Sequence, residues 1–292
     1  MSVLTLAALD PMVAIVVTVL AGVLGLLVGS FLNVVVWRVP RGESIVTPPS
    51  SCPRCGHRIR RRHNIPVISW VALRGRCHDC GQPISARYPL VEVATGLAFA
   101  GVTHWGLFGH LPAMLGEGET HIGDDALVIS TTLFLYFAAI SVALVLIDLD
   151  VNRLPNAIVY PSYVVIAAGI LAVTVFTGDW GSALRAGICM AALFAAYLAM
   201  AIAYPAGMGL GDVKLAGVIG LILGWLGLGP LLVGAFSAFL LGGIFSIALL
   251  LMRKAGRKSG IPFGPWMIAG AWVGILWGDT IFDSYLVLVG LK

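Results

Sequence analysis

Residues 193–229 read LFAAYLAMAIAYPA, then GMGLGDVKL, then AGVIGLILGWLGLG, and this stretch decides the fold. On both sides of the short segment at 207–215 the chain is apolar for about a membrane's thickness. A carboxylate at the edge of a bilayer is costly unless it faces a polar cavity or a partner. The stretch therefore predicts two membrane helices joined next to a functional residue, Asp212.

The whole chain has the composition of an integral membrane protein. Of its 292 residues 59% are hydrophobic and 11% are charged, and the mean hydropathy is +0.97. A spanning helix needs about 20 mostly apolar residues. The expected fold class is therefore an all-α polytopic membrane protein with about eight transmembrane helices, at 11–37, 89–112, 126–147, 156–177, 181–204, 213–227, 230–252 and 264–288.

The distribution of basic residues predicts the orientation, because short loops rich in Lys and Arg stay cytoplasmic. Ten of the 18 Lys and Arg residues lie in 38–87, and four lie in 253–258. The loops at 113–125, 178–180 and 228–229 contain none. Arg185, near the outer end of the fifth stretch, is expected to snorkel. Both termini are then outside, and the first stretch is a retained helix, since no basic residue precedes it and no small-residue cleavage site follows it.

This orientation places two aspartates at the same cytoplasmic face. Asp212 lies between the fifth and sixth helices, and Asp148, in LIDLDVNRLPN (146–156), lies between the third and fourth. Two carboxylates a few ångströms apart cannot both ionise easily, so they can share a proton and hold a water between a base and an acid. That arrangement is typical of aspartyl proteases. Gly209 and Gly211 would permit a tight turn and the close approach of a substrate backbone.

The residues alone leave alternatives open. Asp212 can serve as an N-cap of the sixth helix, and Asp148 can pair with Lys214 or Arg153. Asp150 is a second candidate in the turn at 148–155, although Asp148 directly follows the apolar run and is expected to lie deeper.

The predicted cytoplasmic loop contains a metal-binding pattern. Two C-x2-C pairs are separated by 21 residues, close to the spacing of zinc ribbons. Disulfides are the alternative, but they are rare in the reducing cytoplasm. The predicted zinc ligands are Cys52, Cys55, Cys77 and Cys80. Cys189 is interpreted as a packing residue. The arginines at 58–62 are interpreted as contacts with anionic lipid, and no nucleic-acid partner is expected.

Taken together, these motifs resemble the type IV prepilin peptidases, also called prepilin leader peptidase/N-methyltransferases. The resemblance covers nearly the whole chain and rests on GSFLNVVVWRVPRG (29–42), the double C-x2-C loop, ISARYPLVE (84–92), the aspartate seven residues before Pro155, and GLGDVKL (209–215). It implies that Asp148 and Asp212 are the catalytic pair.

The resemblance also implies a substrate and a second activity. Such enzymes cut the leader from prepilins or pseudopilins at the cytoplasmic face of the bacterial inner membrane. Most then methylate the new N-terminal amine with S-adenosylmethionine, an activity associated with the large loop. Candidate substrate or cofactor contacts are Gly209, Gly211, Lys214, Gly29, Asn33, Arg38, Arg87 and Glu92. For the five of these residues that lie between positions 29 and 92, the alternative roles are helix packing and an ion pair between Glu92 and an arginine.

The resulting organisation is a first helix at 1–38, a methylation-associated zinc loop at 39–88, a second helix with its outer loop at 89–125, and a six-helix peptidase core at 126–292. A peptidase that does not methylate remains an alternative, as does an inactive zinc-loop scaffold. A proton- or ion-coupled transporter is a third alternative function, although transporters usually show inverted repeats with sites near the bilayer midplane. The oligomeric state and the pilin system served are not predicted.

Overall fold

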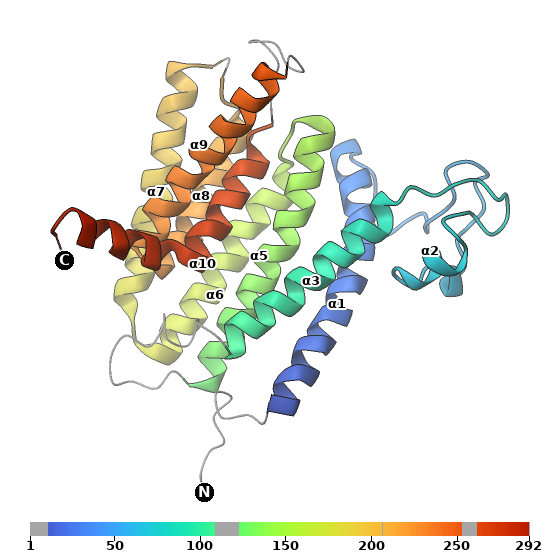
Figure 1. Ribbon diagram of the computed structural model, residues 1–292, viewed down its shortest axis with the longest axis horizontal. Coiled ribbons are helices and arrows are strands. Elements are labelled where there is room, and N and C mark those ends of the chain that lie inside the picture. Colours follow the sequence, from blue (N-terminus) through green and yellow to red (C-terminus); the bar gives the residue numbers. More distant parts are fainter. Residues whose placement is uncertain (1–10, 109–122, 206, 253–261, 292) are drawn as a thin grey trace, which may run out of the picture. The chain divides into compact units, whose positions relative to one another are not determined.

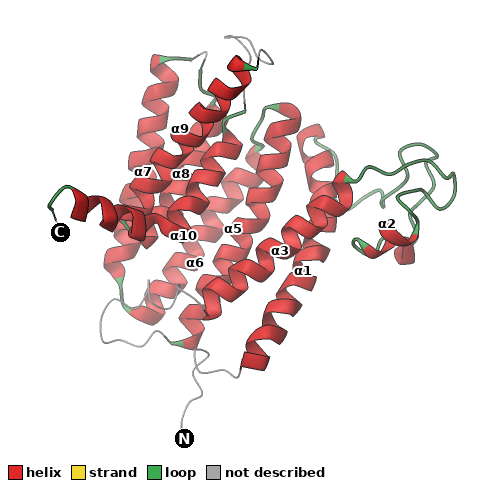
Figure 2. Cartoon of the chain, in the orientation of Figure 1, coloured by secondary structure: helices red, strands yellow, loops and turns green. Residues whose placement is uncertain are grey.

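The protein is helical throughout the part that the structure describes. The computed structural model describes residues 11–108, 123–205, 207–252 and 262–291 (Figures 1 and 2). Within these ranges there is no β-strand, and two isolated β-bridges lie in the loop after the first helix. The predicted all-α fold class is confirmed.

Eight long helices lie within the described ranges, and each matches one predicted apolar stretch. Six of them are long and apolar enough to cross a membrane, and α8, with 17 residues, and α10 are the other two. The protein is therefore a multi-pass membrane protein. The eight helices are α1 (Pro11–Arg38), α3 (Arg87–Phe108), α5 (Asp124–Val151), α6 (Asn156–Thr177), α7 (Trp180–Ala203), α8 (Leu210–Leu226), α9 (Leu228–Leu251) and α10 (Gly264–Leu288).

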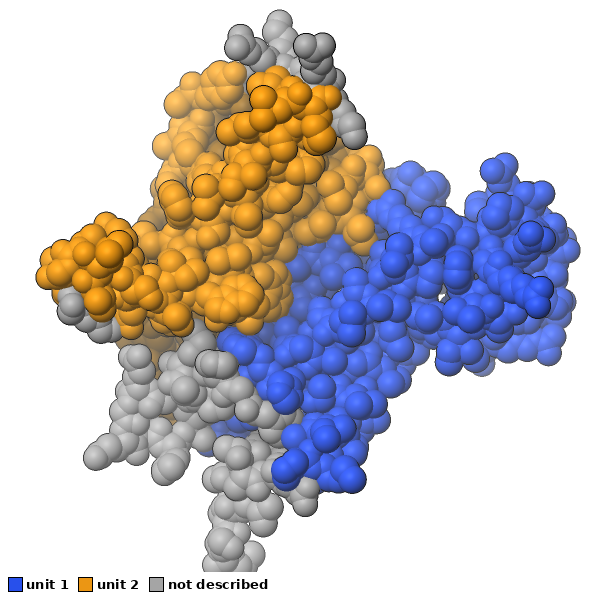
Figure 3. Space-filling view, in the orientation of Figure 1, with its two compact units in different colours: residues 1–143 blue, residues 144–292 orange. Residues whose placement is uncertain are grey.

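The chain divides into two compact units, residues 1–143 and 144–292, with the division inside α5 (Figure 3). In the first unit, α1 and α3 lie side by side, and the loop between them extends beyond their ends (Figure 1). The loop contains the short helices η2 (Val39–Arg41), η3 (Arg61–His63) and α2 (Ile68–Ala72).

Glycines bring α1 and α3 into close contact. A Cβ atom added at Gly25 would lie 2.7 Å from the carbonyl oxygen of Thr95, and one at Gly29 would lie 2.8 Å from Cα of Glu92. Small residues at such contacts are typical of membrane helix pairs, where close backbone packing replaces the hydrophobic effect. Gly29 therefore has a packing role in the structure.

The second unit is built around α8, whose residues Val213 and 215–225 are all buried. It contacts α6, α7, α9 and α10. A helix that is apolar on all sides is expected inside a bundle and not on its surface. The bundle therefore holds α8 within protein, and the first turn of α8 contains Asp212.

Both predicted polar turns are shorter than expected, because the helices extend into them. The turn expected at 148–155 begins only after Val151, so Asp148 and Asp150 lie in the last turn of α5. The turn expected at 205–214 ends at Gly209, so Gly211, Asp212 and Lys214 are helical. An aspartate near a helix N-terminus satisfies free backbone N–H groups, which accounts for the early start of α8.

Candidate active site and metal centre

Asp148 is buried, with 4% of its surface exposed. Its Oδ2 accepts a hydrogen bond from the backbone N–H of Gly264 at 3.0 Å. Asp150 is exposed, as expected because two residues along a helix correspond to a rotation of about 200°. Of the two aspartates at this helix end, the structure buries Asp148 and turns Asp150 outward.

Asp212 occupies the third position of α8, and its Oδ2 accepts a hydrogen bond from the backbone N–H of Gly209 at 3.2 Å. The N-cap residue is Gly209, so Asp212 caps the helix from within its first turn and is not itself the N-cap. Asp212 also interacts electrostatically with Asp148. The two aspartates thus come from different helices, and each has one carboxylate oxygen bound by the backbone of a glycine.

Neither glycine beside Asp212 adopts an unusual backbone conformation, and Gly211 lies at a close contact between segments. Gly209 has a φ of −81°, which any residue can adopt. A Cβ atom at Gly211 would lie 3.2 Å from Cβ of Leu154, so the first turn of α8 packs closely against the segment that follows α5. The expectation of a tight glycine turn at these positions is wrong, because the chain is already helical from Leu210.

Lys214 binds residues of α6. Its Nζ donates to Oδ1 of Asn156 at 3.0 Å and lies 5.2 Å from the ring centroid of Tyr160. Its carbonyl oxygen accepts a hydrogen bond from the hydroxyl of Tyr163 at 2.6 Å. Among the described residues, Asp148 has no ion pair with Lys214 or Arg153. Lys214 therefore connects α8 to α6 beside the aspartate pair.

The loop between α1 and α3 brings four cysteines together. Cys52, Cys55, Cys77 and Cys80 are free thiols whose sulfur atoms all lie within 4.8 Å of one another. The sulfurs of Cys52 and Cys80 are 3.9 Å apart. Four sulfurs at about 2.3 Å from one zinc ion would be about 3.8 Å apart. The cluster therefore fits a single tetrahedral metal ion.

The two cysteine pairs adopt the same local structure. The N–H of Cys52 donates to the carbonyl of His57, and the N–H of Cys77 donates to the carbonyl of Gln82. A glycine with positive φ follows each pair, Gly56 at 72° and Gly81 at 67°, because the left-handed conformation favours glycine. The backbone N–H groups of Cys55 and Arg54 lower the pKa of Cys52 to about 7, whereas burial and the neighbouring thiols raise the pKa of Cys55 to about 12. The thiolate is the form that binds metal, so binding of a metal ion would release the protons of the remaining thiols.

Three of the polar residues predicted near this loop bind backbone groups of the loop or of α3. Oε2 of Glu92 accepts a hydrogen bond from the N–H of Val67 at 2.7 Å. Nδ2 of Asn33 donates to the carbonyl of Tyr88 at 3.2 Å. The guanidinium of Arg38 donates to the carbonyl of Ser44 at 2.9 Å and to that of Pro48 at 2.7 Å. Arg87 is the exposed first residue of α3. Glu92 and Arg38 thus anchor the loop to α3 and α1, and Asn33 joins α1 to the start of α3.

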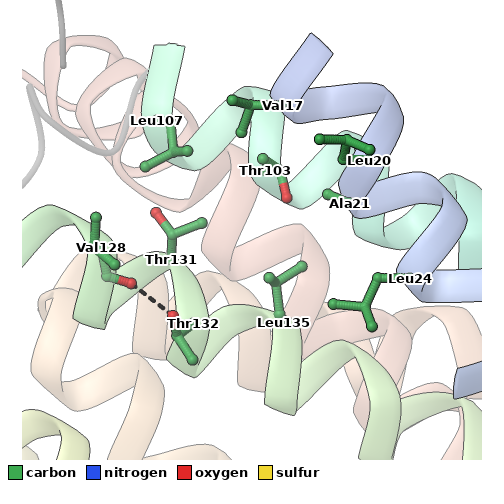
Figure 4. Close-up of a pocket in the computed structure, with 10 residues that line it drawn as sticks. All are labelled: Val17, Leu20, Ala21, Leu24, Thr103, Leu107, Val128, Thr131, Thr132 and Leu135. Atoms are coloured by element: carbon green, nitrogen blue, oxygen red, sulfur yellow. Dashed lines mark hydrogen bonds between the residues drawn. The ribbon is translucent and has the colours of Figure 1, made fainter. Parts of the chain in front are cut away.

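An apolar cavity of about 320 Å³ lies between α1, α3 and α5 in the first unit (Figure 4). Thr103 borders it with a buried hydroxyl that has no hydrogen-bond partner. Its lining includes no ionisable side chain. The lining residues are Val17, Leu20, Ala21, Leu24, Thr103, Leu107, Val128, Thr131, Thr132 and Leu135.

Residues 23–105 match the model of the bacterial peptidase A24 N-terminal domain, and residues 135–247 match that of the type IV leader peptidase family. The chain is 35% identical to the prepilin leader peptidase/N-methyltransferase of Stutzerimonas stutzeri, across 90% of this chain and 92% of that protein. The chain belongs to the type IV leader peptidase family.

Two other members of this family are similar to the chain over nearly the full length of both proteins. The protein of the same name from Pseudomonas putida is 36% identical across 93% of this chain and 94% of its own length. The protein of the same name from Pseudomonas aeruginosa is 35% identical across 92% of this chain and 93% of its own length. No solved structure matches the chain. As a member of this family, the protein is a multi-pass protein of the bacterial inner membrane.

The sequence analysis missed Gly264, although this residue binds Asp148. The signal available was the sequence Pro262-Phe263-Gly264-Pro265, which marks the start of a helix. The sequence does not say which carboxylate that helix start meets. The sequence analysis also missed Tyr163 and Asn156, because their contacts with α8 depend on how the helices pack.

Proposed function

We propose that this protein cleaves the leader peptide of type IV prepilins or pseudopilins at the cytoplasmic face of the inner membrane and then methylates the new N-terminal residue. The observation that supports the peptidase activity is that the structure buries Asp148 at the end of α5 and holds Asp212 in the first turn of α8, each by the backbone N–H of a glycine, in a chain of the type IV leader peptidase family. The relatives' name, prepilin leader peptidase/N-methyltransferase, supports both activities.

The aspartate pair performs the hydrolysis. One carboxylate is ionised and takes a proton from a water molecule, whose oxygen attacks the carbonyl carbon of the scissile peptide bond. The other is protonated and donates a hydrogen bond to the carbonyl oxygen, which becomes negatively charged during the attack. The amine that leaves is protonated from the pair, so the proton shared by Asp148 and Asp212 is restored at the end of each cycle.

The orientation follows from the positive-inside rule. The strongly basic loop at 38–87 lies in the cytoplasm, both termini lie outside, and the aspartates lie at the cytoplasmic face. A basic leader then stays in the cytoplasm while the apolar stem of the substrate stays in lipid, so the scissile bond reaches the aspartates without crossing the membrane.

The cysteine cluster binds one structural zinc ion. Its support is the close grouping of four free thiols in two identical turns. The loop that it orders belongs to the methylating part of the protein, to which Gly29, Asn33, Arg38, Arg87 and Glu92 also belong. S-adenosylmethionine supplies the methyl group when it is bound. Arg38 and Glu92 contribute by fixing the loop to α1 and α3, and Asn33 contributes by holding α1 against the start of α3.

One experiment tests both activities. The purified protein in detergent is mixed with a prepilin, with and without S-adenosylmethionine, and the products are read by mass spectrometry. The expected product is a mature pilin that lacks its leader, and it is one methyl group heavier when the donor is present. Cleavage without methylation would identify a peptidase only. An intact substrate under both conditions would refute the proposal.

A further inference from the structure

The amide of Gly264 meets the carboxylate of Asp148 at the point where α10 begins. Phe263 is the N-cap of α10 and Gly264 is its first residue. The first N–H groups of a helix have no partner within the helix, and the one at Gly264 donates to Oδ2 of Asp148 across 116 positions of sequence. The free amide at a helix start is thus satisfied by the buried carboxylate.

No side chain fits at position 264 while Asp148 keeps its place. A Cβ atom there would lie 2.7 Å from Oδ2 and 3.3 Å from Cγ of Asp148, and 3.4 Å from Cδ2 of Leu154. The contact with Leu154 is an ordinary one, whereas the contact with Oδ2 is a collision. Gly264 does not have a left-handed φ. Glycine is therefore required at position 264 because a side chain would collide with the carboxylate, and not because the backbone adopts a conformation that only glycine tolerates.

The start of α10 is fixed by aromatic packing from two other helices. The ring centroid of Phe263 lies 5.3 Å from that of Phe239 on α9 and 6.5 Å from that of Tyr197 on α7. Tyr197 also interacts electrostatically with Asp212. A side chain added at Gly264 would therefore displace the carboxylate of Asp148, because α10 is held in place by its neighbours.

We propose that Gly264 is a positioning residue for the cleavage reaction. The backbone N–H of Gly264 holds Oδ2 of Asp148. Because Gly264 has no side chain, the carboxylate keeps this orientation. Oδ1 of Asp148 is then free to take part in sharing a proton with Asp212. The inference rests on the proposed peptidase function, since positioning Asp148 matters only if Asp148 reacts. Gly264 itself touches neither substrate nor water in this scheme and acts through Asp148.

The first test measures stability and needs no activity. Gly264→Ala is made in the wild-type chain and in Asp148→Ala, and the melting temperature of each protein is measured in detergent. In the wild type the substitution is expected to lower the melting temperature by about 4 °C or more. In Asp148→Ala the colliding oxygen is absent, so the same substitution should change it by less than about 1 °C. The difference between the two shifts in melting temperature, one in the wild type and one in Asp148→Ala, measures the coupling between Gly264 and Asp148.

Two matched glycines serve as controls. A Cβ atom at Gly270, also on α10, would lie 2.5 Å from the carbonyl oxygen of Gly234 and 2.6 Å from the backbone nitrogen of Ala238. Gly270→Ala should therefore destabilise the protein equally with and without the Asp148 carboxylate. At Gly243 on α9 a Cβ atom would meet nothing within 4 Å, so Gly243→Ala should leave cleavage unchanged and should not lower the melting temperature, because alanine is the better helix former.

The second test is kinetic. Gly264→Ala is expected to lower kcat for prepilin cleavage by about a hundredfold, because a catalytic group displaced by about 1 Å loses that much. KM should change less than about threefold, since the substrate contacts remain. If Gly264→Ala does not fold alone but folds together with Asp148→Ala, the proposal is supported.

Equal destabilisation by Gly264→Ala in both backgrounds would overturn the proposal, and so would a Gly264→Ala enzyme with wild-type kcat. Failure of the wild-type protein to cleave a prepilin would instead refute the proposed function. The melting experiment would then still report whether Gly264 and Asp148 are coupled.

Discussion

At the scale of single residues, the site depends on which carboxylates are buried and what holds them. Asp148 is 4% exposed and is bound by the amide of Gly264, whereas Asp150 on the same helix end is exposed. Asp212 is bound by the amide of Gly209. A backbone amide holds a carboxylate in one orientation without adding a second charge, so each aspartate keeps one oxygen for its partner.

We expect Asp148→Asn and Asp212→Asn each to abolish cleavage while the protein remains folded and inserted. An amide has nearly the shape of a carboxylate but cannot accept the proton of the attacking water. The loss should exceed about a thousandfold, and the measurement is cleavage of a prepilin with melting temperature as the folding control.

Asp150→Asn is the matched control, because it makes the same chemical change two residues away on the exposed side of α5. It should retain most of the activity. An inactive Asp150→Asn together with an active Asp148→Asn would show that the first catalytic aspartate is assigned incorrectly.

At the scale of elements, α8 is held at both ends by side chains from neighbouring helices. Near Asp212, the hydroxyl of Tyr163 on α6 donates to the carbonyl of Lys214. At the other end, Nε of Arg185 on α7 donates to the carbonyl of Gly224, and its Nη2 donates to that of Trp225, both at 2.9 Å. The final carbonyls of a helix lack partners within it, so Arg185 caps α8 where simple snorkelling was expected.

Arg185→Ala should therefore destabilise the protein. It leaves two carbonyls of α8 without donors, at a cost of about 1–3 kcal/mol each where they are buried from water. Thermal melting in detergent measures the loss. Arg185→Lys should recover only part of the stability, because an ammonium is a point donor and does not match the fork of the guanidinium. Unchanged melting of both variants would show that the cap contributes little.

The cysteine loop is the second element with a testable requirement. We expect about one zinc ion per chain, lost when Cys52 and Cys55 are both changed to serine, because a loop this short cannot bury enough apolar surface to order itself. Metal analysis and limited proteolysis measure the two effects, and the variant loop should be cut faster.

Cys189→Ala is the control for the loop experiment, since Cys189 is buried in α7 and belongs to no cysteine cluster. It should retain the zinc. Freshly purified protein without zinc, in which these four loop cysteines form disulfides, would overturn both the metal site and the cytoplasmic placement of the loop.

At the scale of the whole molecule, we propose that the two activities belong to different compact units. The aspartates lie in residues 144–292, whereas the cysteine loop, its anchors Glu92 and Arg38, and Asn33 lie in residues 1–143. Hydrolysis requires a pair of groups that share a proton. Methyl transfer requires a neutral amine in line with a sulfonium methyl group, which is a matter of positioning and desolvation. The two requirements can be met by separate residues.

The double variant Asp148→Asn, Asp212→Asn should therefore still methylate a substrate supplied already cleaved, with its mature N-terminal phenylalanine free. Glu92→Ala should show the opposite pattern and lose methylation more than cleavage, because it frees the N–H of Val67 and loosens the loop. Mass spectrometry of both products measures the ratio. A folded double variant that binds S-adenosylmethionine but does not methylate would show that the two sites overlap.

The sequence by itself determined the features that depend on local pattern. Apolar runs long enough to span a bilayer predict helices because lipid offers the backbone no other hydrogen-bond partner. The two C-x2-C pairs predict a metal cluster because each pair forms its own turn. The spacing of Asp148 and Asp212 along the chain, together with the basic loops, predicts that both lie at one face.

Only the tertiary structure decided how these helices are held and which groups complete the site. The bond between Gly264 and Asp148 joins positions 116 apart, and the cap of α8 by Arg185 joins positions 39 and 40 apart. Neither follows from a local pattern, because each depends on which faces of neighbouring helices meet. Those faces are selected by glycines such as Gly220, where a Cβ atom would lie 2.7 Å from the carbonyl of Cys189. A glycine in the sequence does not show which helix will pack against it.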